Sequence, residues 1–163
     1  MICIFYLTLR ALDTIEDDTH SFVGKMQLKI DLLVSFHTRL DDLNWFLSGI
    51  GEHDEEELLR NFYRISRVFA TFTLSKRTVI KDITRKMGAG MAEFVPRDMS
   101  TGTSTIEQYN RYCYFVAGLV GEGLSSLFVS SGLEQNSLSC DLQRSHTMGL
   151  FLQKTNIIRY VIY

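Results

Sequence analysis

The sequence predicts an all-α fold. Apolar residues recur every three or four positions through most of the 163-residue chain, which is the spacing of one helix face. The alternation of apolar and polar residues that marks a half-buried strand is absent. A single proline, Pro96, and a hydrophobic content of 45% suit one compact helical domain rather than a disordered chain.

The first predicted helix ends in a cluster of acidic residues. Its apolar stripe begins at Ile4 and ends at Leu12, and Asp13, Glu16 and Asp17 then stand at i, i+3 and i+4 on one face. Like charges at this spacing repel one another, and acidic side chains late in a helix oppose its dipole. A bound cation would neutralise them, and oxygen ligands without histidine or cysteine favour Mg²⁺.

A solvated acidic helix end is the alternative to a metal site. Arg10 lies three residues before Asp13 and would pair with part of the charge. Runs of charged residues usually lie on the surface. The spacing alone therefore leaves both interpretations open.

Three further helices are predicted before the proline. The second carries its apolar stripe over residues 28–40. The third runs over about 54–69 and opens with four acidic residues, where the helix dipole favours them. Ser75 is the candidate cap of the fourth, which runs toward Phe94.

Glycines interrupt two of the predicted helices. Gly88 and Gly90 lie in the fourth, and Gly118, Gly121 and Gly123 thin one side of the fifth. Glycine lowers helix propensity, so a glycine kept inside a helix needs another reason. We expect Gly88 and Gly90 to allow the close approach of a neighbouring backbone or of a ligand.

The fifth helix starts at a capping box formed by Ser104 and Glu107. It carries Tyr112, whose side chain either packs in the core with a satisfied hydroxyl or serves a site. A polar loop follows over 130–139, and a last helix is predicted from about Asp141 to the end of the chain.

A polar stripe marks this last helix. Gln153, Asn156 and Arg159 recur every third residue on an otherwise apolar segment. Such a stripe faces either a polar cavity or solvent. The pattern alone does not decide between the two.

Composition excludes several classes of function. A net charge of −2 gives no electrostatic basis for binding nucleic acid or an anionic membrane surface. Cys3, Cys113 and Cys140 are odd in number and widely spaced, unlike a disulfide framework or a zinc site. No membrane span is predicted, because the most apolar window, 114–133, contains Glu122 and is interpreted as a buried helix. The N-terminus lacks the features of a secretory signal.

Three stretches together are characteristic of a known family. They are Leu9–Asp18, Tyr112–Gly121 and Met148–Arg159. With them the chain closely resembles the squalene synthases, the farnesyl-diphosphate farnesyltransferases of the squalene/phytoene synthase family. The resemblance runs from residue 2 to residue 159, more loosely between 20 and 57, and the string Gly149–Asn156 favours squalene synthases over phytoene synthases.

The resemblance implies an isoprenoid-synthase (type I) helical bundle, here incomplete, around a deep cavity. In that family two molecules of farnesyl diphosphate condense head to head to presqualene diphosphate, which NADPH then reduces to squalene for sterol biosynthesis. Mg²⁺ assists departure of the diphosphate. Full-length members lie on the cytosolic face of the endoplasmic reticulum membrane, held by a C-terminal anchor.

The resemblance also assigns roles to residues. Asp13, Glu16 and Asp17 match the first aspartate-rich motif, which holds Mg²⁺ against a diphosphate. Tyr112 matches the catalytic tyrosine, expected to remove a proton or to stabilise the carbocation. The other matches bind cofactor or substrate: Arg10 and Arg159 contact phosphates of NADPH or substrate, and Gln153 and Asn156 line the cavity.

The end of the chain departs from the family pattern. In the family the helix continues into a second motif of the form Asp-Tyr-x-Glu-Asp, whereas here Arg159 is followed by Tyr-Val-Ile-Tyr. We therefore expect one partial domain over 1–163, family-like over 2–159, with an aberrant tail at 160–163 that we interpret as a gene-model artefact. The alternatives to a squalene synthase are a catalytically inactive fragment that lacks the second motif and the anchor, and a phytoene synthase-type enzyme that needs no NADPH.

Overall fold

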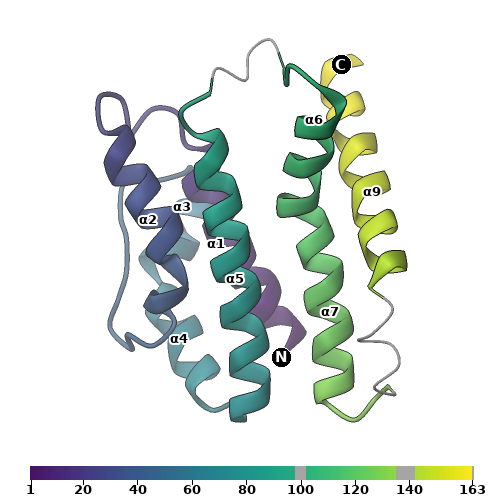
Figure 1. Ribbon diagram of the computed structural model, residues 1–163. Coiled ribbons are helices and arrows are strands. Elements are labelled where there is room, and N and C mark those ends of the chain that lie inside the picture. The colour runs from purple at the N-terminus through teal and green to yellow at the C-terminus, as the bar shows by residue number, and fades with distance from the viewer. Residues whose placement is uncertain (98–101, 135–141, 163) are drawn as a thin grey trace. The chain divides into compact units, whose positions relative to one another are not determined.

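The computed structural model describes residues 1–97, 102–134 and 142–162, without the side chains of 160–162 (Figure 1). The part of the chain so described is helical and contains no strand, which confirms the all-α prediction. The chain divides into two compact units, Met1–Pro96 and Arg97–Tyr163. The predicted helix start at Asp141, residues 135–139 of the predicted loop and the side chains of the 160–163 tail lie outside the described residues.

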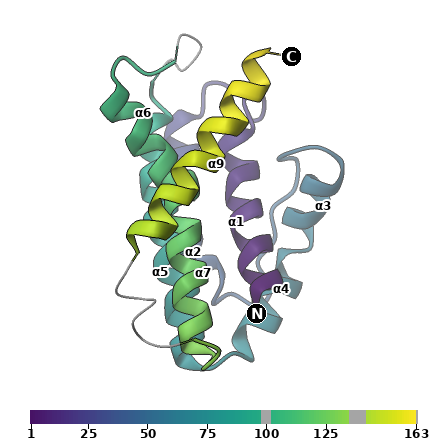
Figure 2. The same cartoon turned by 90° about the vertical axis from the view of Figure 1, so that its right-hand side faces the viewer.

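The first unit consists of five helices. They are α1 (Ile2–Asp17), α2 (Met26–Arg39), α3 (His53–Arg60), α4 (Phe62–Ala70) and α5 (Leu74–Phe94). Helix α1 contacts each of the other four, as its position beside α3 and α4 illustrates (Figure 2). The acidic helix is therefore the central element of this unit.

Aromatic side chains form the centre of the first unit's core. The rings of Phe36, Trp45 and Phe62 meet edge to face, with centroids 5.1 to 5.6 Å apart. Edge-to-face pairs add to the free energy gained by burying the rings. Trp45 lies in the loop between α2 and α3, Phe36 on α2 and Phe62 on α4, so this cluster ties the loop to α2 and α4.

Gly88 allows α2 and α5 to lie unusually close together. A Cβ atom at this position would lie 2.2 Å from the carbonyl oxygen of Leu33 on α2. No side chain other than hydrogen fits that space. The expectation of a close backbone approach at Gly88 is thus confirmed.

The single helix predicted over 54–69 is wrong, because the segment is two helices that divide at Asn61. The backbone N–H of Leu47, in the preceding loop, donates to the carbonyl of Leu59 at 3.0 Å. In a continuous helix this carbonyl would accept a backbone N–H of the same helix. The Asn61 side chain donates to the Glu57 carbonyl, a local bond that competes with helix continuation.

Two predicted caps are displaced by one or two residues. Helix α5 starts at Leu74 after Thr73, so Ser75 lies inside the helix. Helix α6 (Ile106–Cys113) is capped by Thr105, whose hydroxyl accepts the N–H of Gln108 at 3.2 Å. The sequence holds two overlapping capping boxes, and the structure uses the one that starts at Thr105 rather than at Ser104.

The second unit contains α6, a π-helical segment η1 (Tyr114–Gly118), α7 (Leu119–Ser130) and α9 (Gln143–Ile162). Helix α9 packs against the other three, and small residues line that contact. A Cβ at Gly121 would lie 2.9 Å from the Ser145 carbonyl oxygen, and one at Gly149 would lie 2.8 Å from that of Ala117. Gly121 on α7 and Gly149 on α9 therefore serve the packing of α9 against the other helices of this unit.

The continuous helical run Ile106–Ser130 is the one described helix whose length and hydropathy would suffice to cross a membrane. Within its most apolar window 33% of the residues are buried in the structure. Core helices of soluble proteins meet the same criteria of length and composition.

Replacing Gly88 by alanine tests the close contact between α2 and α5. Helix propensity alone would stabilise the variant by about 1 kcal/mol, but we expect the clash with Leu33 to lower its free energy of unfolding by about 1–3 kcal/mol. Denaturant unfolding measures the change. The reverse substitution at the exposed neighbour, Ala89→Gly, calibrates propensity in the same helix, and a stabilised G88A variant would contradict the packing.

Candidate active site

Helix α1 presents the acidic cluster beside the core of the first unit. Its core-facing residues are buried, and they are Phe5, Thr8, Leu9, Ala11, Leu12, Thr14 and Ile15. Asp13 and Glu16 are partly buried, and Asp17 is exposed. Packing on one side of the helix thus holds two carboxylates at the edge of an apolar interior.

The electrostatics of this cluster are strongly perturbed. Burial, together with the charges of Asp17 and Glu16, raises the pKa of Asp13 from 3.8 to about 8. Burial and the neighbouring Asp17 raise the pKa of Glu16 from 4.5 to about 7. Asp13 and Glu16 cannot both ionise near neutral pH at low cost unless a cation joins them.

Lys29 of α2 is a compensating charge that was not predicted from the sequence. Its ammonium group donates to the backbone carbonyls of Glu16 and Asp18, the latter at 3.0 Å. It also lowers the pKa of Glu16, against the larger effect of burial. A cation at the carbonyl end of α1 complements the helix dipole there.

Asp18, the residue after the cluster, anchors a loop. Its carboxylate accepts the backbone N–H groups of His20, Ser21 and Gly51 at 2.7 to 3.0 Å, and the Ser21 hydroxyl at 2.8 Å. Burial alone raises the pKa of Asp18, but these hydrogen bonds outweigh it and lower the pKa below its usual value. Its acceptor capacity is used within the protein, which sets it apart from Asp13 and Glu16.

Arg10 points toward α3 from the opposite end of the cluster. Its guanidinium pairs with the carboxylate of Glu55, and both side chains are more than a third exposed. Arg10 and Glu55 line a cavity of about 610 Å³ between α1, α3 and α4. Arg10 also lowers the pKa of Asp13, while burial and the acidic neighbours raise it more.

The carboxylate oxygens of Asp13 and Glu16 suit Mg²⁺ if the ion also has ligands from outside the protein. Within the described residues, no three carboxylate, imidazole or thiolate side chains gather closely enough to hold a metal ion. Mg²⁺ usually binds one or two carboxylates and completes its octahedron with waters and ligand phosphates. The pair of perturbed carboxylates therefore fits a magnesium ion shared with a phosphate rather than an all-protein cage.

Tyr112, the predicted catalytic tyrosine, lies near the end of α6 in the second unit and is partly buried. Two residues later the π-helical segment η1 begins. Tyr114 in that segment packs its ring on His146 of α9, with centroids 4.9 Å apart. Burial raises its pKa, and so do the charge of Glu122 and a hydrogen bond to it. Single π turns are frequent at functional sites, and this one was not predicted.

Helix α9 carries the predicted polar stripe. Gln153 is partly buried, whereas Asn156 and Arg159 are exposed. Between them Lys154 reaches the ring of Tyr109 on α6, with 5.6 Å from Nζ to the centroid. Burial raises the pKa of Cys113 beside this pair, and Lys154 opposes the effect. The second unit thus holds Tyr112 and the stripe, and the first unit holds Arg10, Asp13, Glu16 and Asp17.

Comparison with known proteins places these observations in a family. The family model described as squalene/phytoene synthase matches residues 1–163. The squalene synthase of Mus musculus is 48% identical over 158 residues, covering 97% of this chain and 36% of that protein. Squalene synthase LSS of Botryococcus braunii is 46% identical over 159 residues, covering 97% and 32%.

Solved structures agree with the sequence comparison. The structure of TcSQS with the ligand E5700 is 45% identical, with a TM-score of 0.90, and the match covers 97% of this chain and 44% of that one. The complex of TcSQS with BPH1237 gives a TM-score of 0.89. The chain spans about a third of the length of the curated relatives it matches.

The raised pKa of Asp13 predicts a pH-dependent stability in the absence of metal. The folded chain keeps this proton up to about pH 8, whereas the unfolded chain loses it near 3.8, so stability falls as the pH rises through that window. We expect Asp13→Asn to have a higher Tm than the parent above pH 8, and the gain to shrink toward acid.

Thermal melts in EDTA across this window provide the measurement. Asp31→Asn is the control, because Asp31 is exposed on α2 and its Oδ1 accepts a hydrogen bond from Gln27 that an amide oxygen can also accept. If Tm changed with pH in the same way in the parent chain and in D13N, the Asp13 carboxyl would titrate normally and the prediction would be wrong.

Proposed function

The chain belongs to the squalene/phytoene synthase family, and we propose that its residues serve the squalene synthase reaction. Two molecules of farnesyl diphosphate would be joined head to head to presqualene diphosphate, and NADPH would reduce this product to squalene. The names of the relatives, at 46 to 48% identity over nearly the whole chain, support this proposal. The resemblance also suggests the cytosolic face of the endoplasmic reticulum membrane as its location.

The observation that carries the proposal is the perturbed carboxylate pair of α1. Asp13 and Glu16, with Asp17 beside them, would hold Mg²⁺ against the substrate diphosphate. The bound ion would supply neutralisation of the charge that develops on the departing diphosphate. Burial makes both carboxylates costly to ionise alone, so a bound cation would displace their protons and neutralise the two charges together.

Arg10 and Arg159 are proposed to bind phosphates of the substrate or of NADPH. A guanidinium donates two parallel hydrogen bonds to a phosphate and stays charged at any working pH. Arg10 is held by Glu55 beside the 610 Å³ cavity, so its position is fixed before a ligand arrives. Binding energy then need not be spent on ordering this side chain.

Tyr112 is proposed to be the catalytic tyrosine, either removing a proton or stabilising a carbocation with its ring. Tyr112 lies two residues before the π-helical segment η1, and the helical run that contains both packs tightly against α9. Gln153 and Asn156 are proposed, from the family resemblance, to line the cavity that receives the substrate. Apolar walls would exclude the water that otherwise quenches a carbocation.

Binding of a substrate analogue tests the metal site directly. We expect the chain to bind farnesyl thiodiphosphate, which resists departure of its diphosphate, only in the presence of Mg²⁺. Asp13→Asn and Asp17→Asn should weaken that binding by about tenfold or more, because each removes a charged ligand. Isothermal titration calorimetry gives the affinities, with D31N as control. Equal affinity with and without Mg²⁺ would refute the proposed site.

Product analysis separates the remaining alternatives. The resemblance implies a diphosphate clamp made of two acidic motifs, of which Asp13, Glu16 and Asp17 match the first, and among the described residues no group of three or more metal-binding side chains gathers. We therefore expect the 163-residue chain alone, given labelled farnesyl diphosphate, Mg²⁺ and NADPH, to bind without forming squalene. Joined to the flanking segments of a squalene synthase it should form squalene, and replacement of Tyr112 by phenylalanine should abolish this. An NADPH-independent product would favour the phytoene synthase-type alternative.

A further inference from the structure

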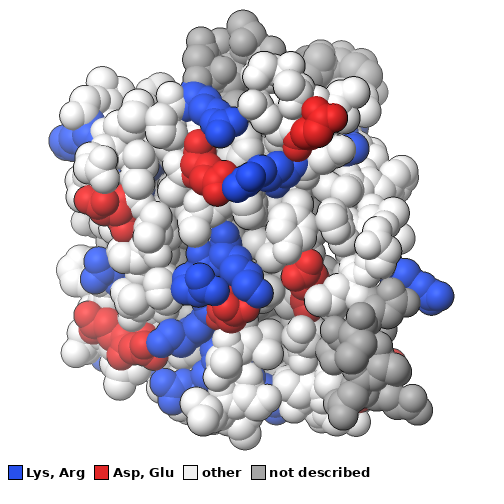
Figure 3. Space-filling model, viewed as in Figure 1, with Lys and Arg blue, Asp and Glu red and all other residues white. Residues whose placement is uncertain are grey.

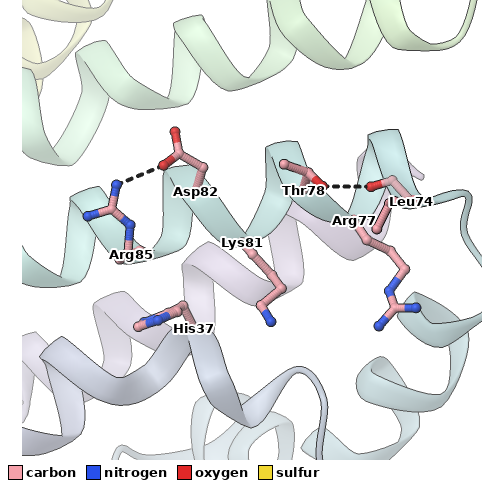
Figure 4. A pocket seen from close by; sticks show the side chains of 7 residues that line it. All are labelled: His37, Leu74, Arg77, Thr78, Lys81, Asp82 and Arg85. Carbon is pink, nitrogen blue, oxygen red and sulfur yellow. Dashed lines mark hydrogen bonds and ion pairs between the residues drawn. The ribbon is translucent and has the colours of Figure 1, made fainter.

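A second polar cavity in the first unit lies away from the acidic cluster. Its volume is about 430 Å³, and its walls come from α5 and from His37 of α2 (Figure 4). Arg77, Lys81 and Arg85 recur every fourth residue along α5 and therefore share one face. In Figure 4 the side chains of Arg77 and Lys81 extend from the same side of α5, and Asp82 points the other way.

The charge around this cavity does not balance. Asp41 pairs with both Arg77 and Lys81, and Asp82 pairs with both Arg85 and Lys86. Of these basic groups Arg77, Lys81 and Arg85 line the cavity, and they share two carboxylates, which leaves one positive charge in excess there. Figure 3 shows basic side chains gathered over α5 on this face.

Arg77 is held in place with donors unused. Its guanidinium carbon lies 5.3 Å from the centre of the Phe69 ring, a cation–π contact that fixes the plane of the group. Its Nε is shielded from solvent and has no hydrogen-bond partner in the described residues. Its link to Asp41 is long, at 3.4 Å. Because the pairing with Asp41 is long, an anion in the cavity would offer this guanidinium shorter, charge-assisted hydrogen bonds.

We propose that this cavity binds a phosphoryl group. Arg77 supplies the planar fork that matches phosphate oxygens, and Lys81 adds a mobile point charge. The exposed side chain of Leu74 at the edge of the cavity offers an apolar contact for whatever the phosphoryl group carries. A soluble phosphate ester and a phospholipid headgroup present the same chemistry to these residues.

Asp41 competes with the ligand for the same two cations. An incoming phosphoryl group would take over the pairing of Lys81 and the long contact of Arg77. Removing the Asp41 carboxylate should therefore strengthen anion binding rather than weaken it. This gain distinguishes a specific site from general damage to the fold.

The test titrates the chain with inorganic diphosphate in EDTA, so that no metal can recruit diphosphate to α1. We expect saturable binding, weakened about tenfold or more in Arg77→Gln and Lys81→Gln and strengthened several-fold in Asp41→Asn. Lys86→Gln removes the same charge on the same helix outside the cavity, and should change affinity by less than about twofold. If R77Q fails to fold, K81Q and D41N decide the matter.

Vesicles distinguish the two sources of the phosphoryl group. Phosphatidylcholine vesicles with and without phosphatidic acid are compared with free diphosphate in a flotation assay. Binding to phosphatidic acid that K81Q loses, without binding of free diphosphate, indicates a lipid headgroup; saturable binding of free diphosphate indicates a soluble ester. Equal losses in K81Q and K86Q, unchanged affinity in D41N, or no saturable binding to either probe would overturn the proposal.

Discussion

The candidate site depends on one constraint, the repulsion among the carboxylates of α1. Packing on the other side of the same helix holds these carboxylates in place. Seven buried residues of α1 fix it against the four other helices of the first unit. Asp13 and Glu16 cannot move away from the apolar edge without moving the helix. Their protons, or a cation, must therefore carry the compensation.

The surroundings of α1 compensate this repulsion in part. Lys29 caps the carbonyl end of the helix, and Asp18 fastens the loop around Gly51 to that end. Arg10 and Glu55 tie the start of the cluster to α3. Each of these contacts fixes geometry, and the pKa values of Asp13 and Glu16 still stay raised. Part of the negative charge of these carboxylates is left uncompensated, and in the proposed function a magnesium ion bound with a diphosphate would neutralise it.

Periodicity predicted the helices well because each buries one continuous face, and it predicted the acidic cluster because that cluster is local in sequence. It missed what tertiary contacts decide. The division at Asn61 depends on a loop N–H that reaches the Leu59 carbonyl, and Lys29 reaches α1 from a neighbouring helix. The π turn after Cys113 has no periodic signature, since one inserted residue alters only a single turn. The roles of Tyr112 and of the α9 stripe rest on family resemblance and stay predictions.

The most direct test of this account is an NMR titration of the Asp13 and Glu16 side-chain carboxyl carbons, with and without Mg²⁺ and farnesyl thiodiphosphate. If packing holds Asp13 at the apolar edge of α1, its carboxyl titrates near pH 8 in the free chain. Its midpoint should fall toward the acid range once metal and ligand are both present, because a bound cation favours the ionised carboxylate. An Asp13 that titrates near its ordinary value of 3.8, with no response to Mg²⁺ and ligand, would contradict it.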